Sequence, residues 1–398
     1  MSVDTYKFIP CLALVSSLVG CGSDDTSNAT PSVTRDAVVK NYSANLYTAY
    51  SDSVADEVAF QKTVAAFIKA PADKTLGAAR QGWLDSREHY MRTEGARFYG
   101  GPIDGEIDGA PNYEGLVNSW PLDEAYIDYK VEDGVLNEDT GIINLPQEVP
   151  EITAEALDAK NAEGGDENVS AGYHAVEFLL WGQALNPSGP GERPATDYAL
   201  DGPTKNPDRR AAYLTVAVEG IVGSLTAVRD AWSPTASYRV AFEKTTDASL
   251  TNMFTGLAKF SKGELASQRI GAAYKSKERH DQHDCFSSQT LLDYERDARG
   301  IQAMYLGKYG DNDGPGLDDL VKSADPALDA DLKQKLQASI DAIVAIPKPF
   351  EDAIAGDDDS EGRVAIQNAL NALSAQGDTF GLAAKALGLT IVVDDPEE

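Results

Sequence analysis

The sequence contains few cysteines, which stabilise small exported proteins through disulfides, and few histidines, which are common in catalytic sites. It has three cysteines among its 398 residues, Cys11, Cys21 and Cys285, and only four histidines. It contains no C-x-x-C-H haem motif, no G-x-S-x-G nucleophile motif and no Gly-rich phosphate loop after a strand. The sequence therefore gives no support to a c-type haem protein, a serine hydrolase or a P-loop nucleotide-binding enzyme.

Positive charge is also scarce. Lys and Arg number 34 against 64 Asp and Glu, which gives a formal net charge of −30 at pH 7. A field of this sign repels nucleic acid and anionic lipid head groups and attracts cations. Solubility alone explains such a charge equally well, so acidity does not by itself predict a metal site. We expect no nucleic-acid partner.

Long hydrophobic runs are missing as well. The run from Phe8 to Gly20 is too short to span a bilayer and follows a single cation, Lys7. A short apolar segment behind a positive residue is typical of a secretory signal, so we predict a signal peptide over residues 1–20. A buried N-terminal helix is the alternative. No later stretch is apolar and long enough to predict a transmembrane helix.

The end of that segment, Leu18-Val19-Gly20-Cys21, resembles a bacterial lipoprotein processing site. The resemblance implies cleavage before Cys21, acylation of its thiol, and a flexible tether over residues 21–34. Gly22 after the cysteine implies the outer membrane in Gram-negative bacteria. We therefore expect an outer-membrane lipoprotein, periplasmic or surface-exposed, that contacts the membrane only through Cys21.

The number of cysteines also indicates whether disulfides can stabilise the fold. With Cys11 removed and Cys21 acylated, Cys285 has no partner within the chain, so no intramolecular disulfide can form. A protein of an oxidising compartment without disulfides depends on its hydrophobic core. We expect Cys285 to be buried rather than reactive.

Helical spacing of apolar residues dominates the remaining chain. Apolar stripes predict helices around residues 38–49, 54–68, 76–90, 170–187, 207–232, 250–257, 291–305, 332–343 and 364–387. Alternating patterns typical of strands are scarce, and the clearest, residues 390–393, is equally consistent with a frayed tail. The fold class predicted is all-α, with mostly antiparallel helices.

Two composition changes divide the chain. Residues 100–165 are rich in Gly, Pro and acids and predict a long irregular connection, and residues 186–207 predict a domain boundary. We therefore expect two helical-bundle domains, at 35–190 and 205–390. The irregular connection belongs to the first.

The most informative histidine is His174. It lies three residues before Glu177, so both side chains share one helix face within a segment that is apolar nearly all round. A buried ionisable pair is costly unless it is hydrogen-bonded or binds a metal. The spacing alone leaves a metal site and a structural His–Glu pair both open. The residue after Glu177 is Phe178, so neither H-E-x-x-H nor H-x-x-E-H is present.

These residues belong to a wider pattern. Gly172, His174 and Glu177 form G-x-H-x-x-E, the signature of the imelysin family, also known as M75 peptidases, which this chain resembles. The resemblance covers about residues 35–350, and its iron-regulated protein A branch is the most similar. The other blocks that carry it are residues 82–88, 93–99, 118–124, 126–129, 191–198 and 283–287.

The resemblance implies two helical bundles, a periplasmic or outer-membrane location and a connection with iron uptake. It places Glu94 in a family block, where it is a candidate third ligand beside His174 and Glu177. Arg87 is a candidate for holding an anion or orienting a carboxylate, with a surface ion pair as its alternative. The ligand expected is a metal ion, iron or zinc, or an iron-containing ligand, with iron-uptake proteins as partners.

Two other groups of polar residues are weaker candidates. His280 and His283, with Asp281 and Asp284, resemble a loose metal cluster, but their polar surroundings favour a solvated turn. Asp311-Asn312-Asp313-Gly314 resembles a calcium loop without the Glu required at its twelfth position, so we interpret it as a turn.

Three functions remain open. The first is an imelysin-like lipoprotein that binds a metal and takes part in iron uptake. The second is a zinc-dependent M75-type metallopeptidase, in which a metal on His174 activates water. The third is a partner-binding lipoprotein whose His174–Glu177 pair is structural.

Overall fold

The structure, a computed structural model, describes residues 33–105 and 109–393. The chain from Val33 onward forms one compact unit. The signal peptide, Cys21 and nearly all of the expected tether lie outside the described residues.

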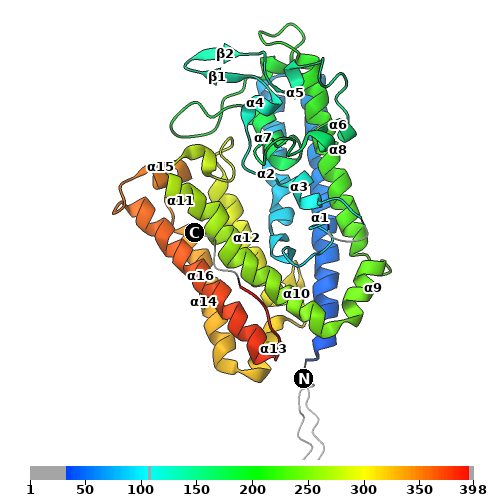
Figure 1. Cartoon of the computed structure of the whole chain (residues 1–398), viewed down its shortest axis with the longest axis vertical. Helices are drawn as coiled ribbons and strands as arrows, with labels where there is room; N and C mark the ends of the chain where they lie inside the picture. Colours follow the sequence, from blue (N-terminus) through cyan, green and yellow to red (C-terminus); the bar gives the residue numbers. More distant parts are fainter. Residues whose placement is uncertain (1–32, 106–108, 394–398) are drawn as a thin grey trace, which may run out of the picture. The chain divides into compact units, whose positions relative to one another are not determined.

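The described residues are predominantly helical, as predicted (Figure 1). The α-helices are α1 (Arg35–Lys69), α2 (Asp73–Met91), α3 (Tyr113–Val117), α4 (Glu124–Ile127), α5 (Gly141–Asn144), α6 (Ala154–Lys160), α7 (Gly172–Trp181), α8 (Pro207–Ala231), α9 (Ser237–Lys244), α10 (Thr246–Lys259), α11 (Ala272–Ser276), α12 (Thr290–Tyr305), α13 (Leu317–Ala324), α14 (Pro326–Val344), α15 (Phe350–Ala355) and α16 (Glu361–Ala386). Three 3-10 helices, η1 (Glu94–Ala96), η2 (Ala195–Tyr198) and η4 (Arg279–Asp281), and a π-helix, η3 (Phe260–Gly271), complete the helical elements.

A first group of helices is built around α1. The two stripes predicted at 38–49 and 54–68 belong to this one helix, which begins where the Thr34 side chain accepts from the backbone N–H of Ala37. Helices α2 and α8 pack along α1, and α7 packs against both α2 and α8. In Figure 1 these helices lie side by side. Helix α7 is therefore enclosed by neighbours, and all of its residues are buried.

Helix α8 corrects one expectation from the sequence. By length and composition it is apolar enough to cross a membrane, whereas we predicted no transmembrane helix after residue 20. However, it packs against α1, α3 and α7, and nine of its residues are buried, including Tyr213 and Ile221. These contacts are those of a core helix of a helical bundle.

The second group of helices is built around α16. Helix α14 packs along it, together with α10 and η3, and α12 packs against α14. Helices α10 and α12 also reach the first group through contacts with α1 and α2. Continuous helix runs through α10, η3 and α11, and its π-helical centre was not foreseen because apolar spacing does not distinguish i+4 from i+5 hydrogen bonding.

The division into domains at 35–190 and 205–390 stays a prediction. Its boundary does not follow the packing of α8, which begins after the boundary but contacts α1 and α7. Helix α8 joins the first group because its buried stripe, which includes Leu214, Val218 and Leu225, faces those helices.

In the part of the chain that the structure describes, strands are confined to two small antiparallel hairpins. β1 (Lys130–Glu132) pairs with β2 (Val135–Asn137), and β3 (Lys308–Tyr309) pairs with β4 (Asn312–Asp313). The turn of the second hairpin is at Gly310 and Asp311, so of the turn expected over residues 311–314 only Asp311 lies in it, and Asn312 and Asp313 belong to β4. Residues 390–393 form no strand, which leaves the alternative of a chain tail without regular structure.

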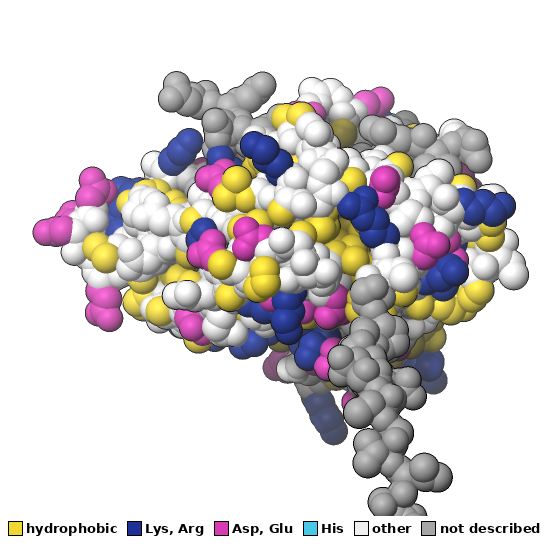
Figure 2. Space-filling view, turned by 90° about the horizontal axis from the view of Figure 1, so that it is seen from below, with side chains coloured by type: hydrophobic (Ala, Val, Ile, Leu, Met, Phe, Trp, Pro, Cys, Tyr) yellow, Lys and Arg dark blue, Asp and Glu magenta, His cyan; other side chains and the backbone are white. Residues whose placement is uncertain are grey.

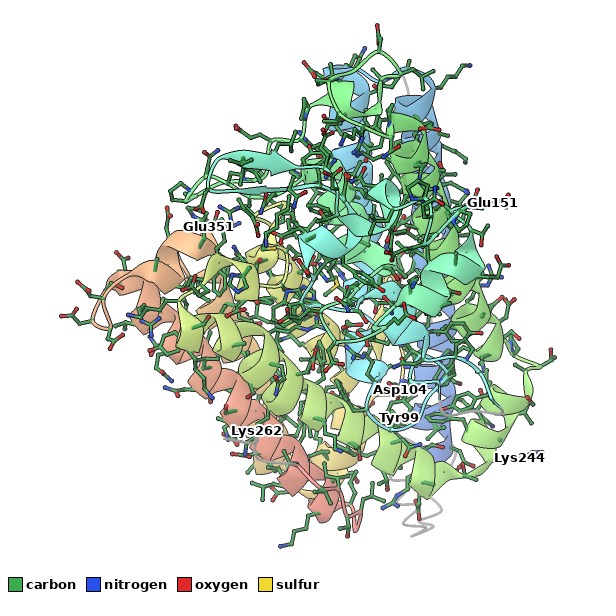
Figure 3. All side chains as sticks on the ribbon, turned by 45° about the horizontal axis from the view of Figure 1, so that its top comes forward. Tyr99, Asp104, Glu151, Lys244, Lys262 and Glu351 are labelled. Carbon is green, nitrogen blue, oxygen red and sulfur yellow. The ribbon has the colours of Figure 1, made fainter. Side chains whose placement is uncertain are left out.

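The connection between η1 and α7 contains α3 to α6 and the first hairpin, joined by irregular segments. Side chains rather than regular structure fix its conformation. For example, the Asp104 carboxylate accepts from the backbone N–H groups of Phe98, Tyr99 and Gly101, and Figure 3 shows Tyr99 and Asp104 next to each other. Figure 2 shows acidic and basic side chains interspersed on one face of the molecule.

Candidate metal centre

Glycine at the start of α7 explains the first position of the G-x-H-x-x-E motif. Gly172 has φ of 85°, and a Cβ there would lie 2.5 Å from the carbonyl oxygen of Val117. Any other residue here would have a strained backbone conformation, and its Cβ would clash with the backbone of α3. Glycine is therefore needed for α7 to begin against α3. The close contact between Gly172 and α3 fixes the position of α7, and with it the positions of the buried side chains of His174 and Glu177.

His174 and Glu177 contact each other within α7. The Nδ1 atom of His174 lies 3.2 Å from Oε2 of Glu177, and the two side chains are 1% and 0% exposed. If Nδ1 carries the proton, it donates to Glu177 and Nε2 keeps a free lone pair. Nε2 is buried and has no hydrogen-bond partner. Glu177 is therefore placed to set the tautomer of His174.

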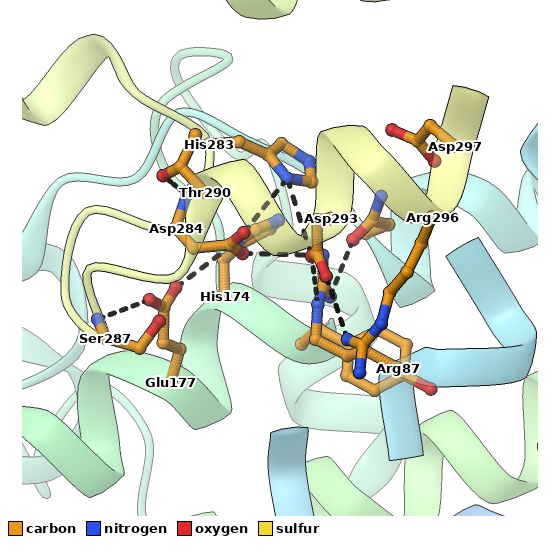
Figure 4. A network of polar contacts seen from close by, with 12 residues as sticks. Arg87, His174, Glu177, His283, Asp284, Ser287, Thr290, Asp293, Arg296 and Asp297 are labelled. Carbon is orange, nitrogen blue, oxygen red and sulfur yellow. Dashed lines mark hydrogen bonds and ion pairs between the residues drawn. The ribbon is translucent and has the colours of Figure 1, made fainter. Parts of the chain in front are cut away.

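A second segment, the site loop (residues 282–289), brings two more groups to His174. The rings of His174 and His283 are 4.5 Å apart, and Asp284 Oδ1 lies 3.7 Å from His174 Nδ1 (Figure 4). His174, His283 and Asp284 each offer a ligand atom, and these atoms lie within 4.8 Å of one another. Among the described residues no other three His, Cys, Asp or Glu side chains meet this condition.

The site loop is held in place by its own polar contacts. The backbone N–H of Ser287 donates to Glu177 Oε1 at 2.7 Å, and that of Asp284 donates to the Thr290 hydroxyl at 3.0 Å. The Trp120 indole donates to the carbonyl of Gln282 at 3.0 Å. These bonds tie the loop to α7, to the start of α12 and to the connection. The two candidate ligand groups on the loop, His283 and Asp284, are thus held in position by contacts within the protein.

Arg87 of α2 lies beneath the site and binds carboxylates, the second of the two roles predicted for it. Its guanidinium is stacked between the rings of Trp83 and Tyr173, at 4.9 and 4.7 Å. One of its nitrogens lies 3.4 Å from Asp284 Oδ1, and its Nε donates to Asp293 at 2.6 Å. Arg87 is fully buried, so the alternative of a surface ion pair was wrong.

Burial sets the protonation of the site. It lowers the pKa of both His174 and His283 well below the ordinary value, with Arg87 acting in the same direction. Burial also raises the pKa of Glu177 well above its ordinary value, and Asp284 adds to this shift. The histidines are therefore neutral, which is the form that binds metals.

Glu94, the predicted third ligand, is not in this group. Its carboxylate binds Arg97 at 2.9 Å and Arg269 of η3. Burial alone would raise the pKa of Glu94, but the two guanidiniums outweigh it and lower the pKa to about 2. These contacts do not support Glu94 as a ligand, because its negative charge is already balanced by two cations.

The interpretation of residues 280–284 as a solvated turn was wrong for two of the four side chains. His283 and Asp284 are buried, whereas His280 is exposed and only pairs with Asp281. The i, i+3 spacing that suggested a cluster of His280 with His283 was therefore misleading. The useful signal was the family block at 283–287, which marked the segment without saying what it contacts. Cys285 is buried, as expected, and burial raises the pKa of its thiol.

Comparisons with known proteins agree with this architecture. A family profile described as imelysin (Peptidase_M75) matches residues 46–380. "Iron-regulated protein A" of Synechococcus elongatus is 25% identical over 343 residues, covering 83% of this chain and 80% of the relative. A crystal structure from Parabacteroides distasonis, provisionally described as an iron-regulated protein A precursor, has a TM-score of 0.67 and 18% identity. It covers 90% of this chain and 97% of its own, and it shows the same fold.

Proposed function

The chain belongs to the imelysin family, and from this premise we propose that it is a lipid-anchored, metal-binding protein that takes part in iron uptake. The proposed ligands are His174, His283 and Asp284. Glu177 holds His174 in the tautomer that binds the ion, and Arg87 orients Asp284. This ligand set replaces the His174, Glu177 and Glu94 set expected from the sequence.

One observation carries the proposal. His174 Nε2, His283 Nδ1 and both carboxylate oxygens of Asp284 are buried without a hydrogen-bond partner. Leaving a buried acceptor unpaired costs about 1–3 kcal/mol, and more for a charged group. His174, His283 and Asp284 each offer a ligand atom within 4.8 Å of the others, and a bound cation would satisfy buried acceptors that otherwise lack a partner.

The donor atoms favour a transition metal. Two imidazoles and one carboxylate form a donor set that suits iron and zinc and is less suited to calcium or magnesium, which prefer oxygen ligands. Between iron and zinc, iron is supported by the name of the relative from Synechococcus elongatus, which is called iron-regulated.

Burial favours binding over peptide hydrolysis. A zinc peptidase keeps one metal position open to water and substrate. Here the three ligand side chains are 1%, 1% and 0% exposed, so a peptide has no direct approach to an ion held among them. Peptidase activity lost in Glu177→Gln but not in a variant of exposed Glu361 would argue for the second candidate function.

Metal analysis of the compact unit from residue 33 onward tests the ligands. We expect about one bound iron or zinc ion per chain, because three converging ligands form one site. His174→Ala and His283→Ala should each weaken binding at least about tenfold. His280→Ala is the matched control, because its side chain is 70% exposed and pairs only with Asp281. Equal metal content in wild type and His174→Ala would refute the ligand assignment.

The lipid anchor is tested separately, because Cys21 lies outside the described residues. In a Gram-negative host, we expect incorporated radiolabelled palmitate and membrane fractionation of the full chain. Both should be lost in Cys21→Ala and kept in Cys11→Ala, since Cys11 lies inside the predicted signal peptide. Palmitate retained in Cys21→Ala would exclude this anchor and leave the metal site untouched.

A further inference from the structure

Arg87 faces two buried carboxylates, and only one of them is a proposed metal ligand. Its Nε donates to Asp293 Oδ2 at 2.6 Å, and one terminal nitrogen forms an ion pair with the same oxygen (Figure 4). That terminal nitrogen lies 3.4 Å from Asp284 Oδ1, which is longer than a charge-assisted hydrogen bond of about 2.7–2.9 Å. Arg87 therefore binds Asp293 closely and leaves Asp284 without a hydrogen bond.

Asp293 of α12 is held from its other side as well. Its Oδ1 accepts from Arg296 at 3.1 Å, and Arg296 donates to the half-buried Glu88 of α2 at 2.7 Å. From the surface inward, the row of alternating charges is Glu88, Arg296, Asp293, Arg87 and Asp284. Burial raises the pKa of Asp293 and Asp284 adds to the rise, whereas Arg87 and Arg296 oppose it. The negative charge of Asp293 therefore depends on both guanidiniums.

The position of Arg87 leaves it a short movement toward Asp284. The aromatic rings against which the guanidinium is stacked keep it in this part of the interior. Its other terminal nitrogen donates to Asn118 at 3.1 Å. Because the nitrogen that pairs with Asp293 is also the one near Asp284, a shift of less than about 1 Å would turn the 3.4 Å approach into a hydrogen bond.

We propose that Asp293 is a positioning residue of the metal site, which holds the Arg87 guanidinium and so keeps the Asp284 carboxylate available to the cation. Asp293 acts through Arg87, and it is not among the residues whose ligand atoms lie within 4.8 Å of one another. Without the charge of Asp293, Arg87 would bond to Asp284 and compete with the ion for its oxygen. This inference rests on the proposed function and adds to it a residue outside the G-x-H-x-x-E motif.

Zinc affinity, measured by competition with a chromophoric chelator, tests the role of Asp293. Asp293→Asn should weaken zinc binding at least about tenfold. The same substitution should have no effect in a protein that already carries Arg87→Met, because no guanidinium is then left to move. Asp297→Asn is the matched control: it removes another buried carboxyl group of α12, which pairs with Arg269 at 3.1 Å, and should change zinc affinity less than about twofold.

A second measurement does not need the metal. In a crystal structure of metal-free Asp293→Asn, the distance from the Arg87 nitrogen to Asp284 Oδ1 should shorten from 3.4 Å to about 2.8 Å. Circular dichroism of every variant separates a lost site from a lost fold.

Two results would overturn the inference alone: an unmoved Arg87 in Asp293→Asn, or an equal loss of zinc affinity with and without Arg87→Met. Wild type that binds no zinc or iron would instead refute the proposed function. The position of Arg87 in the metal-free variant would still show whether Asp293 holds it away from Asp284.

Discussion

Two buried groups of charged residues differ in how their carboxylates are balanced. We call one the structural cluster (Asp128, Arg193 and Arg210) and the other, the candidate metal site, the metal cluster (His174, Glu177, His283, Asp284 and Arg87). In the structural cluster, Asp128 accepts from Arg193 at 2.7 Å and from Arg210 at 2.6 and 2.8 Å, so both of its oxygens are paired. In the metal cluster, Asp284 is equally buried but has no hydrogen-bond partner on either oxygen. Burial is the same in the two clusters, but two guanidiniums hydrogen-bond to Asp128, whereas Asp284 has the Arg87 guanidinium at the longer distance of 3.4 Å.

The pKa directions follow this difference. Burial would raise the pKa of Asp128, but Arg193 and Arg210 outweigh it and hold the pKa below its ordinary value. For Glu177 burial wins, and the neighbouring Asp284 adds to it, so its pKa is raised. A carboxylate that is fully paired stabilises the fold, whereas an excess of buried negative charge is a cost that a bound cation relieves.

The largest expected effect breaks the structural cluster. Asp128→Asn removes the carboxylate that both buried guanidiniums share and leaves Arg193 only its longer contact with Asp197 at 3.4 Å, so the free energy of unfolding should fall by about 3–5 kcal/mol. Denaturant titration measures it. Asp230→Asn, which removes the exposed partner of Arg229, should cost less than about 1 kcal/mol. A similar small loss for both variants would show that Asp128 has no special structural role.

The same substitution in the metal cluster should act on binding and not on stability. Asp284→Asn removes a charged ligand, so metal affinity should fall by more than about 100-fold in competition titrations. The unfolding free energy of the metal-free protein should change by less than about 1 kcal/mol, because Arg87 keeps its ion pair with Asp293. A large loss of stability with unchanged affinity would reverse the contrast between the two clusters.

The site loop is fastened by a residue outside both clusters. Glu351 Oε1 accepts from the backbone N–H of Gly189 and the hydroxyl of Ser288, each at 2.7 Å, and Figure 3 labels it at the start of α15. Glu351→Ala should let the loop open more often and speed metal exchange about tenfold, as followed by stopped-flow with a chelator. The exposed neighbour gives the control, Asp352→Asn. Unchanged exchange rates would mean that the ion enters by another route.

The smallest effect concerns pH. An acid whose folded pKa is raised has no cost below its ordinary value, 4.5 for Glu177, and an increasing cost as pH rises toward the folded pKa. The metal-free Glu177→Gln variant should therefore gain stability over wild type as pH rises above 4.5. Asp128, with a lowered pKa, should show the opposite: its stabilisation is present above 3.8 and is lost as pH falls through the folded value. Parallel pH profiles for Glu177→Gln and Asp128→Asn would contradict the comparison.

The two clusters also show which features of the site could be predicted from the sequence and which could not. The spacing of His174 and Glu177 correctly placed both on one buried helix, because a helical repeat is local. The sequence could not show that Glu94 is balanced by Arg269, since their contact depends on the path of the π-helix η3. It also could not show that His283 is buried while His280 is exposed, because both histidines lie in the same short polar segment of the sequence.

By itself, the sequence determined the all-α class, the family and the helix that carries His174, because apolar periodicity and motif spacing are properties of neighbouring residues. Only the tertiary structure decided the ligand set. It joined α7 to a loop whose Ser287 bonds to Glu177, 110 residues earlier in the chain. It also paired some carboxylates closely with arginines while leaving both oxygens of Asp284 without a hydrogen bond. The physical reason is that tertiary packing decides which groups surround a buried carboxylate. A carboxylate paired with arginines stabilises the fold, whereas one without such partners is available to bind a cation.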